Sequence, residues 1–142
     1  MAVEVNFNCE ELMIFRPYRS VLYIPGGRAR ALQKAREISV DAIIFDLEDA
    51  VAVTEKSSAR ATLLEHLRDG GYGARAQIVR INDIATDWGI DDLAAFAQIK
   101  PEALLLPKVN GAADILALSD LMDVYDGYKE TMIWAMIETP RG

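Results

Sequence analysis

The chain has 142 residues, of which 51% are hydrophobic and 26% charged, and its formal net charge is −7. This composition excludes a disordered acidic tail, and the lack of a basic cluster argues against binding to nucleic acid or to an anionic membrane. No apolar run approaches the roughly 20 residues that span a bilayer, and the acidic amino terminus lacks the basic start of a secretion signal. A single cysteine, Cys9, cannot form an internal disulfide, so a cytoplasmic location is expected.

From residue 19 onward, a short apolar run, a loop and an amphipathic stretch repeat along the chain. The apolar runs are five predicted strands: Ser20–Ile24, Asp41–Leu47, Ala76–Asn82, Ala103–Val109 and Met132–Glu138. The stretches between them are four predicted helices: Arg28–Ile38, Glu55–Leu67, Asp91–Ile99 and Ala112–Tyr125. Thr54 is a possible N-cap of the second helix, and Gly70 with Gly71 ends it. Residues 1–18 are predicted to form an N-terminal arm.

Strands that are apolar throughout and alternate with helices are typical of a parallel sheet covered by helices, so the predicted fold class is α/β. Periodicity alone does not choose between a doubly wound sheet and a (β/α)8 barrel. Charged or amide side chains close four of the predicted strands, and a barrel gathers its active site at that end of every strand. A doubly wound sheet uses only its switch point. The sequence therefore favours the N-terminal portion of a TIM (β/α)8 barrel, with about five strands and four helices, over residues 19–142.

Three carboxylates follow the second predicted strand directly, in Asp46-Leu47-Glu48-Asp49. Crowded carboxylates repel one another unless a cation or hydrogen-bond donors compensate, so a divalent metal or its bound waters would be a natural partner. The alternative is that they cap the next helix or pair with Lys56 and Arg60. The sequence leaves both interpretations open.

Arg80 and Glu138 extend this polar group to other strands. Arg80 lies between apolar residues, where its guanidinium either pairs with the acidic cluster or grips a substrate carboxylate through two parallel hydrogen bonds. Glu138 closes the fifth predicted strand and is expected at the same edge of the sheet as Glu48. Two carboxylates, Glu48 and Glu138, and one arginine at the same edge suggest a hard metal with an anionic chelating ligand. Lys108 either pairs with the acidic residues or is structural.

Other motifs carry weaker signals. Pro25-Gly26-Gly27-Arg28 resembles a phosphate-binding turn at a helix start, but it lacks the G-x-G-x-x-G spacing, so an ordinary strand-to-helix turn is preferred. The only histidine, His66, falls inside a helix and is expected at the surface. One histidine and one cysteine argue against a zinc site and against Cys-His catalysis.

The chain resembles the citrate lyase β-subunit-like family of the HpcH/HpaI aldolase superfamily. The resemblance covers residues 19–142 and rests on the motifs RSVLYIPG, DAIIFDLEDAV, VRIN, LLLPKV and MIETPRG, in that order. It implies a homo-oligomeric TIM barrel that cleaves a carbon–carbon bond with Mg²⁺. The implied substrate is a 3-hydroxy acyl thioester of the citryl-, citramalyl- or malyl-type, carried on coenzyme A or an acyl carrier protein. The implied products are an oxo acid and an acyl thioester.

The resemblance also implies roles for individual residues. Glu138 would be a metal ligand, and Arg80 would hold the carboxylate or carbonyl of the substrate. Asp46 and Glu48 would hold metal-bound water or position the ligand. Arg19, with the glycine turn after it, matches a region that approaches the acyl carrier or coenzyme A in relatives. No residue is identifiable as the proton donor for the enolate product.

The chain departs from the family in length, because a complete barrel needs roughly 250 residues and the family's second metal ligand, an aspartate, would follow Gly142. The preferred explanation is that the sequence is a fragment of a full-length lyase. It could also be a truncated homologue, or a half-barrel completed by another chain. A function of a different class is a non-catalytic acyl-thioester-binding or regulatory homologue, and a further one is a phosphate-binding α/β protein that uses the glycine turn.

Overall fold

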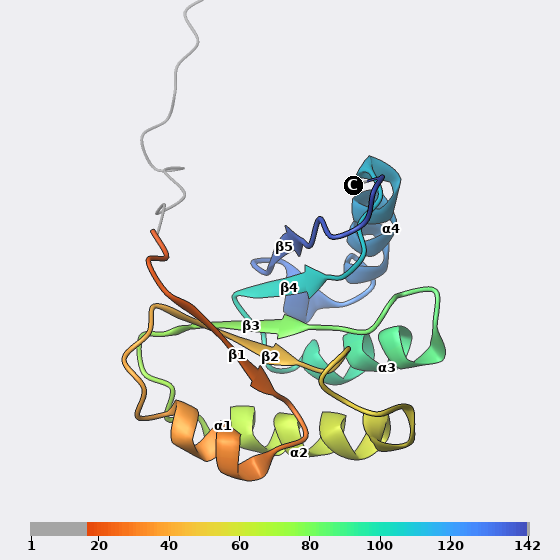
Figure 1. Cartoon of the computed structure of the whole chain (residues 1–142). Coiled ribbons are helices and arrows are strands. Elements are labelled where there is room, and N and C mark those ends of the chain that lie inside the picture. The colour runs from red at the N-terminus through yellow and green to blue at the C-terminus, as the bar shows by residue number, and fades with distance from the viewer. Residues whose placement is uncertain (1–16, 142) are drawn as a thin grey trace, which may run out of the picture.

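The computed structural model describes residues 17–141, so residues 1–16 of the predicted arm, together with Cys9, lie outside the described residues. The strands are β1 (Val21–Pro25), β2 (Ala42–Asp46), β3 (Ala76–Arg80), β4 (Ala103–Leu106) and β5 (Met132–Ala135). The α-helices are α1 (Ala29–Ala35), α2 (Lys56–Asp69), α3 (Asp87–Phe96) and α4 (Ala112–Met122), with short 3-10 helices η1 (Val53–Glu55) and η2 (Asp126–Tyr128). Figure 1 shows their arrangement.

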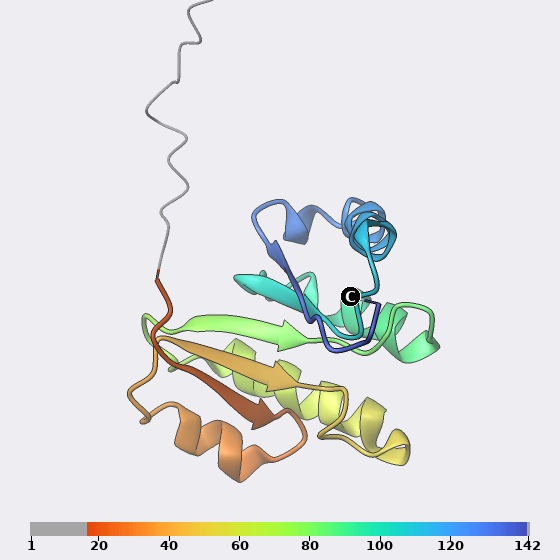
Figure 2. The ribbon, with the colours of Figure 1, turned by 45° about the horizontal axis from the view of Figure 1, so that its top comes forward.

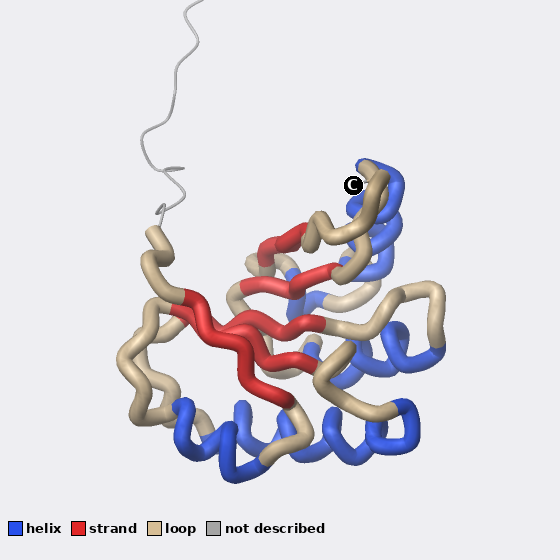
Figure 3. Tube along the Cα trace, viewed as in Figure 1, coloured by secondary structure: helices blue, strands red, loops and turns tan. Residues whose placement is uncertain are grey.

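The five strands form one parallel sheet in the order β1-β2-β3-β4-β5, with every neighbour in the sheet also the next strand in the chain. The strands lie together while α1, α2 and α3 cover one side of them (Figure 3). A doubly wound sheet reverses its strand order at a switch point, whereas this sheet does not. The α/β class and the barrel-type progression predicted from the sequence are confirmed.

The three central strands, β2, β3 and β4, are buried on both faces of the sheet, to which alternate residues of each strand point. The helix-covered face packs strand residues against all four α-helices: Ile24, Ile43, Phe45, Val79, Leu104 and Leu106 meet Leu32, Leu63, Leu93 and Leu118. The opposite face carries small and aliphatic side chains: Ala42, Ile44, Ala76, Ile78, Ala103 and Leu105. The sheet curls around this second face (Figure 2), and the ring centroids of Tyr18 and Trp134 come within 5.3 Å of each other.

Among the described helices, none has the length and apolarity required to cross a bilayer.

One predicted helix start and one possible helix cap are wrong. Helix α3 begins at Asp87, earlier than predicted, because the hydroxyl of Thr86 accepts a hydrogen bond of 3.2 Å from the amide of Gly89 and so caps the helix. Thr54 is not an N-cap, because it lies inside η1, which runs directly into α2. The predicted end of α2 is confirmed at Gly70, whose φ of 70° favours glycine.

Candidate functional site

The acidic cluster, defined as Asp46, Glu48 and Asp49, lies where β2 ends, at the carboxyl edge of the sheet. Asp46 is 3% exposed and Glu48 is 8% exposed. The carboxylate of Asp46 accepts hydrogen bonds from the amides of Glu48 (2.8 Å) and Ala50 (3.1 Å). Asp46 therefore shapes the loop that carries the other two carboxylates.

Arg80 ends β3 directly beside Asp46, because the parallel register pairs these two residues. Its Nε donates to Asp46 Oδ1 at 2.7 Å and its Nη2 to Asp46 Oδ2 at 2.5 Å. The remaining Nη1 lies 3.3 Å from Glu48 Oε2. Of the two interpretations that the sequence left open, the ion pair with the acidic cluster is present. Only the Nη1 side of the guanidinium faces away from Asp46.

In the buried pair of Asp46 and Arg80, both side chains are ionised. Burial by itself raises the pKa of Asp46, but hydrogen bonds from Arg80 and from the Glu48 amide outweigh it and hold that pKa below its usual range. For Arg80, burial lowers the pKa, yet the hydrogen bonds and negative charge of Asp46 raise it further than burial lowers it. The guanidinium is thus a fixed positive charge at the carboxyl edge.

Lys108 connects the acidic cluster to Glu138. Its ammonium donates to Glu48 and lies 3.8 Å from Asp49 Oδ1, while its amide donates to Glu138 Oε1 at 2.9 Å. The hydrogen bond to Glu48, together with the nearby carboxylates, raises the pKa of Lys108. The structure therefore brings Glu138 and Glu48 to one edge, as the sequence predicts, through a lysine whose role the sequence left open.

Within residues 17–141, Lys56 and Arg60 make no ion pair with the carboxylates of the acidic cluster, so the predicted pairing with these two residues is wrong. The buried Lys56 ammonium donates instead to the backbone carbonyls of Leu47 (2.8 Å) and Glu48 (2.6 Å). Burial lowers the pKa of Lys56, although the surrounding carboxylates oppose this effect. Lys56 thus holds the backbone of the loop that carries the acidic cluster. Its positive charge lies close enough to the carboxylates of the cluster to interact with them.

A second buried network fixes Asn82, which follows β3. Asp92 on α3 is 1% exposed and accepts hydrogen bonds from the amide (2.9 Å) and the side chain (2.7 Å) of Asn82. Arg60 on α2 donates to the same carboxylate at 2.7 Å. The network was missed from the sequence, where Asp92 falls inside an amphipathic helix without any local signal for burial.

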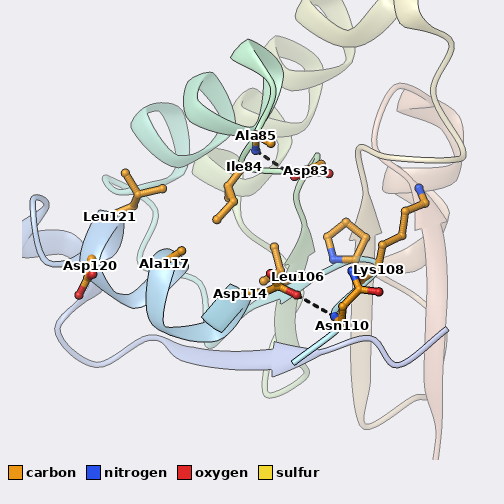
Figure 4. Close-up of a pocket in the computed structure, with 11 residues that line it drawn as sticks. Asp83, Ile84, Ala85, Leu106, Lys108, Asn110, Asp114, Ala117, Asp120 and Leu121 are labelled. Carbon is orange, nitrogen blue, oxygen red and sulfur yellow. Dashed lines mark hydrogen bonds between the residues drawn. The ribbon is translucent and has the colours of Figure 1, made fainter. Parts of the chain in front are cut away.

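Two neighbouring pockets open at the carboxyl edge. The cluster pocket, about 400 Å³, is bordered by Glu48, Lys56, Asn82 and Lys108 among others. The α4 pocket, about 610 Å³, lies between the loop after β3 and helix α4 (Figure 4). Asp83 and Lys108 line both pockets. A ligand at this edge can therefore contact the acidic cluster and extend toward α4.

Residues 17–141 contain no group of three or more acidic, histidine or cysteine side chains placed to hold a metal ion. The crowding in the acidic cluster is compensated by protein cations, since Arg80 and Lys108 pair with its carboxylates. The cluster by itself therefore does not require a metal. Glu138 is exposed and offers an oxygen ligand, and Mg²⁺ commonly binds one or two carboxylates while keeping several waters. The described residues fit one ligand of a magnesium site at Glu138.

Arg19 is not brought to this edge. It precedes β1, at the opposite edge of the sheet, and its guanidinium pairs with Asp41 at 2.8 Å. The glycine turn after β1 does reach the acidic cluster, because the amide of Gly26 donates to the backbone carbonyl of Asp46 at 2.8 Å. The coenzyme-binding role of Arg19 stays a prediction.

Comparison with known proteins gives matches over nearly the whole chain. The family model for HpcH/HpaI aldolase/citrate lyase matches residues 19–142. A (3S)-malyl-CoA thioesterase of Cereibacter sphaeroides is 51% identical over 126 residues, which are 89% of this chain and 42% of that protein. A mitochondrial citramalyl-CoA lyase of Rattus norvegicus is 35% identical over 111 residues, covering 77% of this chain and 33% of that enzyme.

A solved structure is similar to this chain in fold. The citrate lyase β subunit of M. tuberculosis, complexed with oxaloacetate and magnesium, superposes with a TM-score of 0.66 at 32% identity. The match covers 86% of this chain and 48% of the other. The chain thus spans about half of that structure and less than half of the curated relatives.

Proposed function

Because the chain belongs to the HpcH/HpaI aldolase/citrate lyase family, we propose that the polypeptide containing it is a carbon–carbon lyase. The substrate is a 3-hydroxy acyl thioester of the citryl-, citramalyl- or malyl-type, on coenzyme A or an acyl carrier protein. The products are an oxo acid and an acyl thioester. The observation that carries this proposal is the meeting of Arg80, Glu48 and Glu138 at the carboxyl edge, beside a pocket and joined by Lys108.

Mg²⁺ is the cofactor we assign to this reaction, with Glu138 as its ligand in the described chain. The related structure with oxaloacetate and magnesium supports this choice, as does the oxygen chemistry of the exposed carboxylate. The ion would supply Lewis-acid stabilisation of the oxygen that becomes the carbonyl of the oxo acid. The amide of Lys108 orients the Glu138 carboxylate at 2.9 Å.

The cleavage itself moves one proton and two electron pairs. The substrate hydroxyl loses its proton to a base, the oxygen electron pair forms the new carbonyl, and the pair of the broken carbon–carbon bond becomes the enolate of the acyl thioester. The enolate then takes up a proton at carbon and becomes the acyl thioester, so the reaction neither gains nor loses a proton overall. Arg80 faces this edge with Nη1, and we assign to it the carboxylate or carbonyl of the substrate. Asp46 acts through Arg80, because it takes the other two guanidinium donors. Glu48 orients the ligand.

The test is oxo acid formation by the complete polypeptide from citryl-, citramalyl- and malyl-CoA. We expect an oxo acid from at least one of them, loss of activity with a chelator and recovery with Mg²⁺. Glu138→Gln should lower kcat at least a hundredfold, since a metal ligand is removed. If none of the three thioesters yields an oxo acid with Mg²⁺ present, the lyase proposal is wrong.

Hydrolysis of the thioester is a second candidate, favoured by the 51% identity to a (3S)-malyl-CoA thioesterase. In that reaction water adds to the thioester carbonyl and the carbon–sulfur bond breaks, giving a free acid and the coenzyme A thiol. Thiol titration without oxo acid formation would identify it. Binding of the thioester without any product would instead favour the non-catalytic homologue. The homo-oligomeric state stays a prediction that sedimentation of the complete polypeptide can test.

A further inference from the structure

Lys108 lines both pockets and contacts both Glu48 and Glu138. Its side chain is 50% exposed, whereas the Arg80 side chain is 7% exposed. Among residues 17–141, it is the only cation that lines the α4 pocket. The other lysine of the cluster pocket, Lys56, is buried and donates to backbone carbonyls. An anionic ligand entering either pocket therefore meets the Lys108 ammonium.

The backbone of Lys108 is also unusual. Its φ of 54° lies in the left-handed region, which residues with a side chain rarely adopt. Such conformations persist where the surrounding contacts hold them, and they concentrate at ligand sites. Here one residue directs its amide to Glu138 and its ammonium to Glu48. The backbone of the loop thus sets the position of the Lys108 amide relative to Glu138.

We propose that Lys108 is a second residue that binds the substrate anion, exchanging Glu48 for a ligand carboxylate when the pocket fills. This inference rests on the proposed function and adds a binding residue to it. Arg80 gives two donors to Asp46, and its Nη1, which faces the ligand, also lies 3.3 Å from Glu48 Oε2 and 3.6 Å from Asp49 Oδ2. The guanidinium therefore cannot hold a ligand carboxylate through two parallel hydrogen bonds while these contacts stand. A carboxylate with two oxygens then needs another cation, and Lys108 supplies it.

The exchange leaves Glu48 with other partners. Its Oε2 still lies 3.3 Å from Arg80 Nη1 and accepts a hydrogen bond of 3.1 Å from the amide of Asp49. A buried carboxylate that keeps a cation and an amide donor avoids most of the cost of an unpaired charge. The flexible stem of Lys108 allows its ammonium to move without moving the amide that holds Glu138.

The experiment compares wild type with Lys108→Met in the complete polypeptide, using glyoxylate and pyruvate as probes in titration calorimetry with Mg²⁺ present. We expect Lys108→Met to weaken oxo acid binding about tenfold or more, the size of one lost charge-assisted contact. Lys108→Arg should restore binding to within a few-fold of wild type. Mg²⁺ affinity without an oxo acid should change by less than about threefold. The matched control is Lys129→Met, because Lys129 is exposed and pairs with exposed Asp126 at 2.8 Å, and it should leave both affinities unchanged.

Two results would overturn the inference while the proposed function stands. One is equal oxo acid affinity in wild type and Lys108→Met. The other is a parallel loss of Mg²⁺ affinity, oxo acid affinity and Tm in Lys108→Met, which would mean that the lysine only supports the fold. If wild type binds neither probe in the presence of Mg²⁺ and also fails to bind oxaloacetate, the oxo acid that a citryl thioester would release, the proposed function fails together with the inference, and this outcome is distinct from the other two.

Discussion

Asp92→Ala removes the centre of the buried network that holds Asn82 beside the cluster pocket. The carboxylate accepts three hydrogen bonds, at 2.9 and 2.7 Å from Asn82 and at 2.7 Å from Arg60. Alanine leaves the Arg60 guanidinium, whose side chain is 12% exposed, without its buried counter-ion. It also leaves two buried donors of Asn82 unpaired. The variant tests whether this network or apolar packing alone holds α3 on the sheet.

The magnitude follows from these contacts. Breaking a buried ion pair by removing one partner costs about 3–5 kcal/mol, and each buried unpaired donor costs about 1–3 kcal/mol. These losses overlap, because Arg60 and the Asn82 side chain can each rotate toward water or another acceptor. We therefore expect the free energy of unfolding to fall by about 3–5 kcal/mol in total.

The assay is urea-induced unfolding followed by circular dichroism, with Asp91→Ala as the matched control. Asp91 neighbours Asp92 and contacts the same arginine at 3.2 Å, but its side chain is 61% exposed. Its loss should cost less than about 1 kcal/mol, as for surface pairs in general. The reasoning is refuted if Asp92→Ala unfolds within about 1 kcal/mol of wild type, or if the two alanine variants lose equal stability.

Three further predictions concern backbone contact, pH and metal binding. In Gly89→Ala the new Cβ would lie 2.3 Å from the carbonyl oxygen of Asp83, so denaturation should show that the free energy of unfolding falls by about 1–3 kcal/mol. The control is Gly111→Ala, which has open space around the new Cβ and should stay within about 0.5 kcal/mol of wild type. The pKa of Asp46 is lowered on folding, so its stabilisation is complete above the ordinary carboxyl pKa of about 4 and disappears as pH falls through the folded value. Unfolding measured from pH 7 down to pH 3 should thus be less pH-dependent in Asp46→Asn. Glu138→Gln should weaken Mg²⁺ binding in calorimetry at least tenfold and leave Tm within a few degrees, because the side chain is exposed; unchanged affinity would contradict its assignment as a ligand.

The sequence predicted the five strands and the edge at which the polar residues gather, because apolar runs and strand ends are local features. It did not predict which cation pairs with which carboxylate. That choice depends on the register that places Arg80 beside Asp46, and on the packing of α2 against α3 that turns Arg60 toward Asp92. These are contacts between residues more than 30 positions apart in the chain.

Lys108 shows the same limit at a single residue. Pro107 restricts the conformation of the residue before it, not of the residue after it, so the sequence carries no signal for the left-handed backbone at Lys108. The start of α3 was missed for a local reason, since Trp88 and Gly89 resemble a loop until Thr86 is identified as the cap. The polar residues that follow the apolar strands nevertheless lie together at the carboxyl edge, as the sequence predicts.

The most direct test of the account is a product balance for malyl-CoA with the complete polypeptide and Mg²⁺. Cleavage at the carbon–carbon bond predicts glyoxylate and acetyl-CoA in equal amounts, with no free malate and no net release of coenzyme A thiol. Malate and free coenzyme A in equal amounts, without glyoxylate, would contradict it and assign the site to thioester hydrolysis.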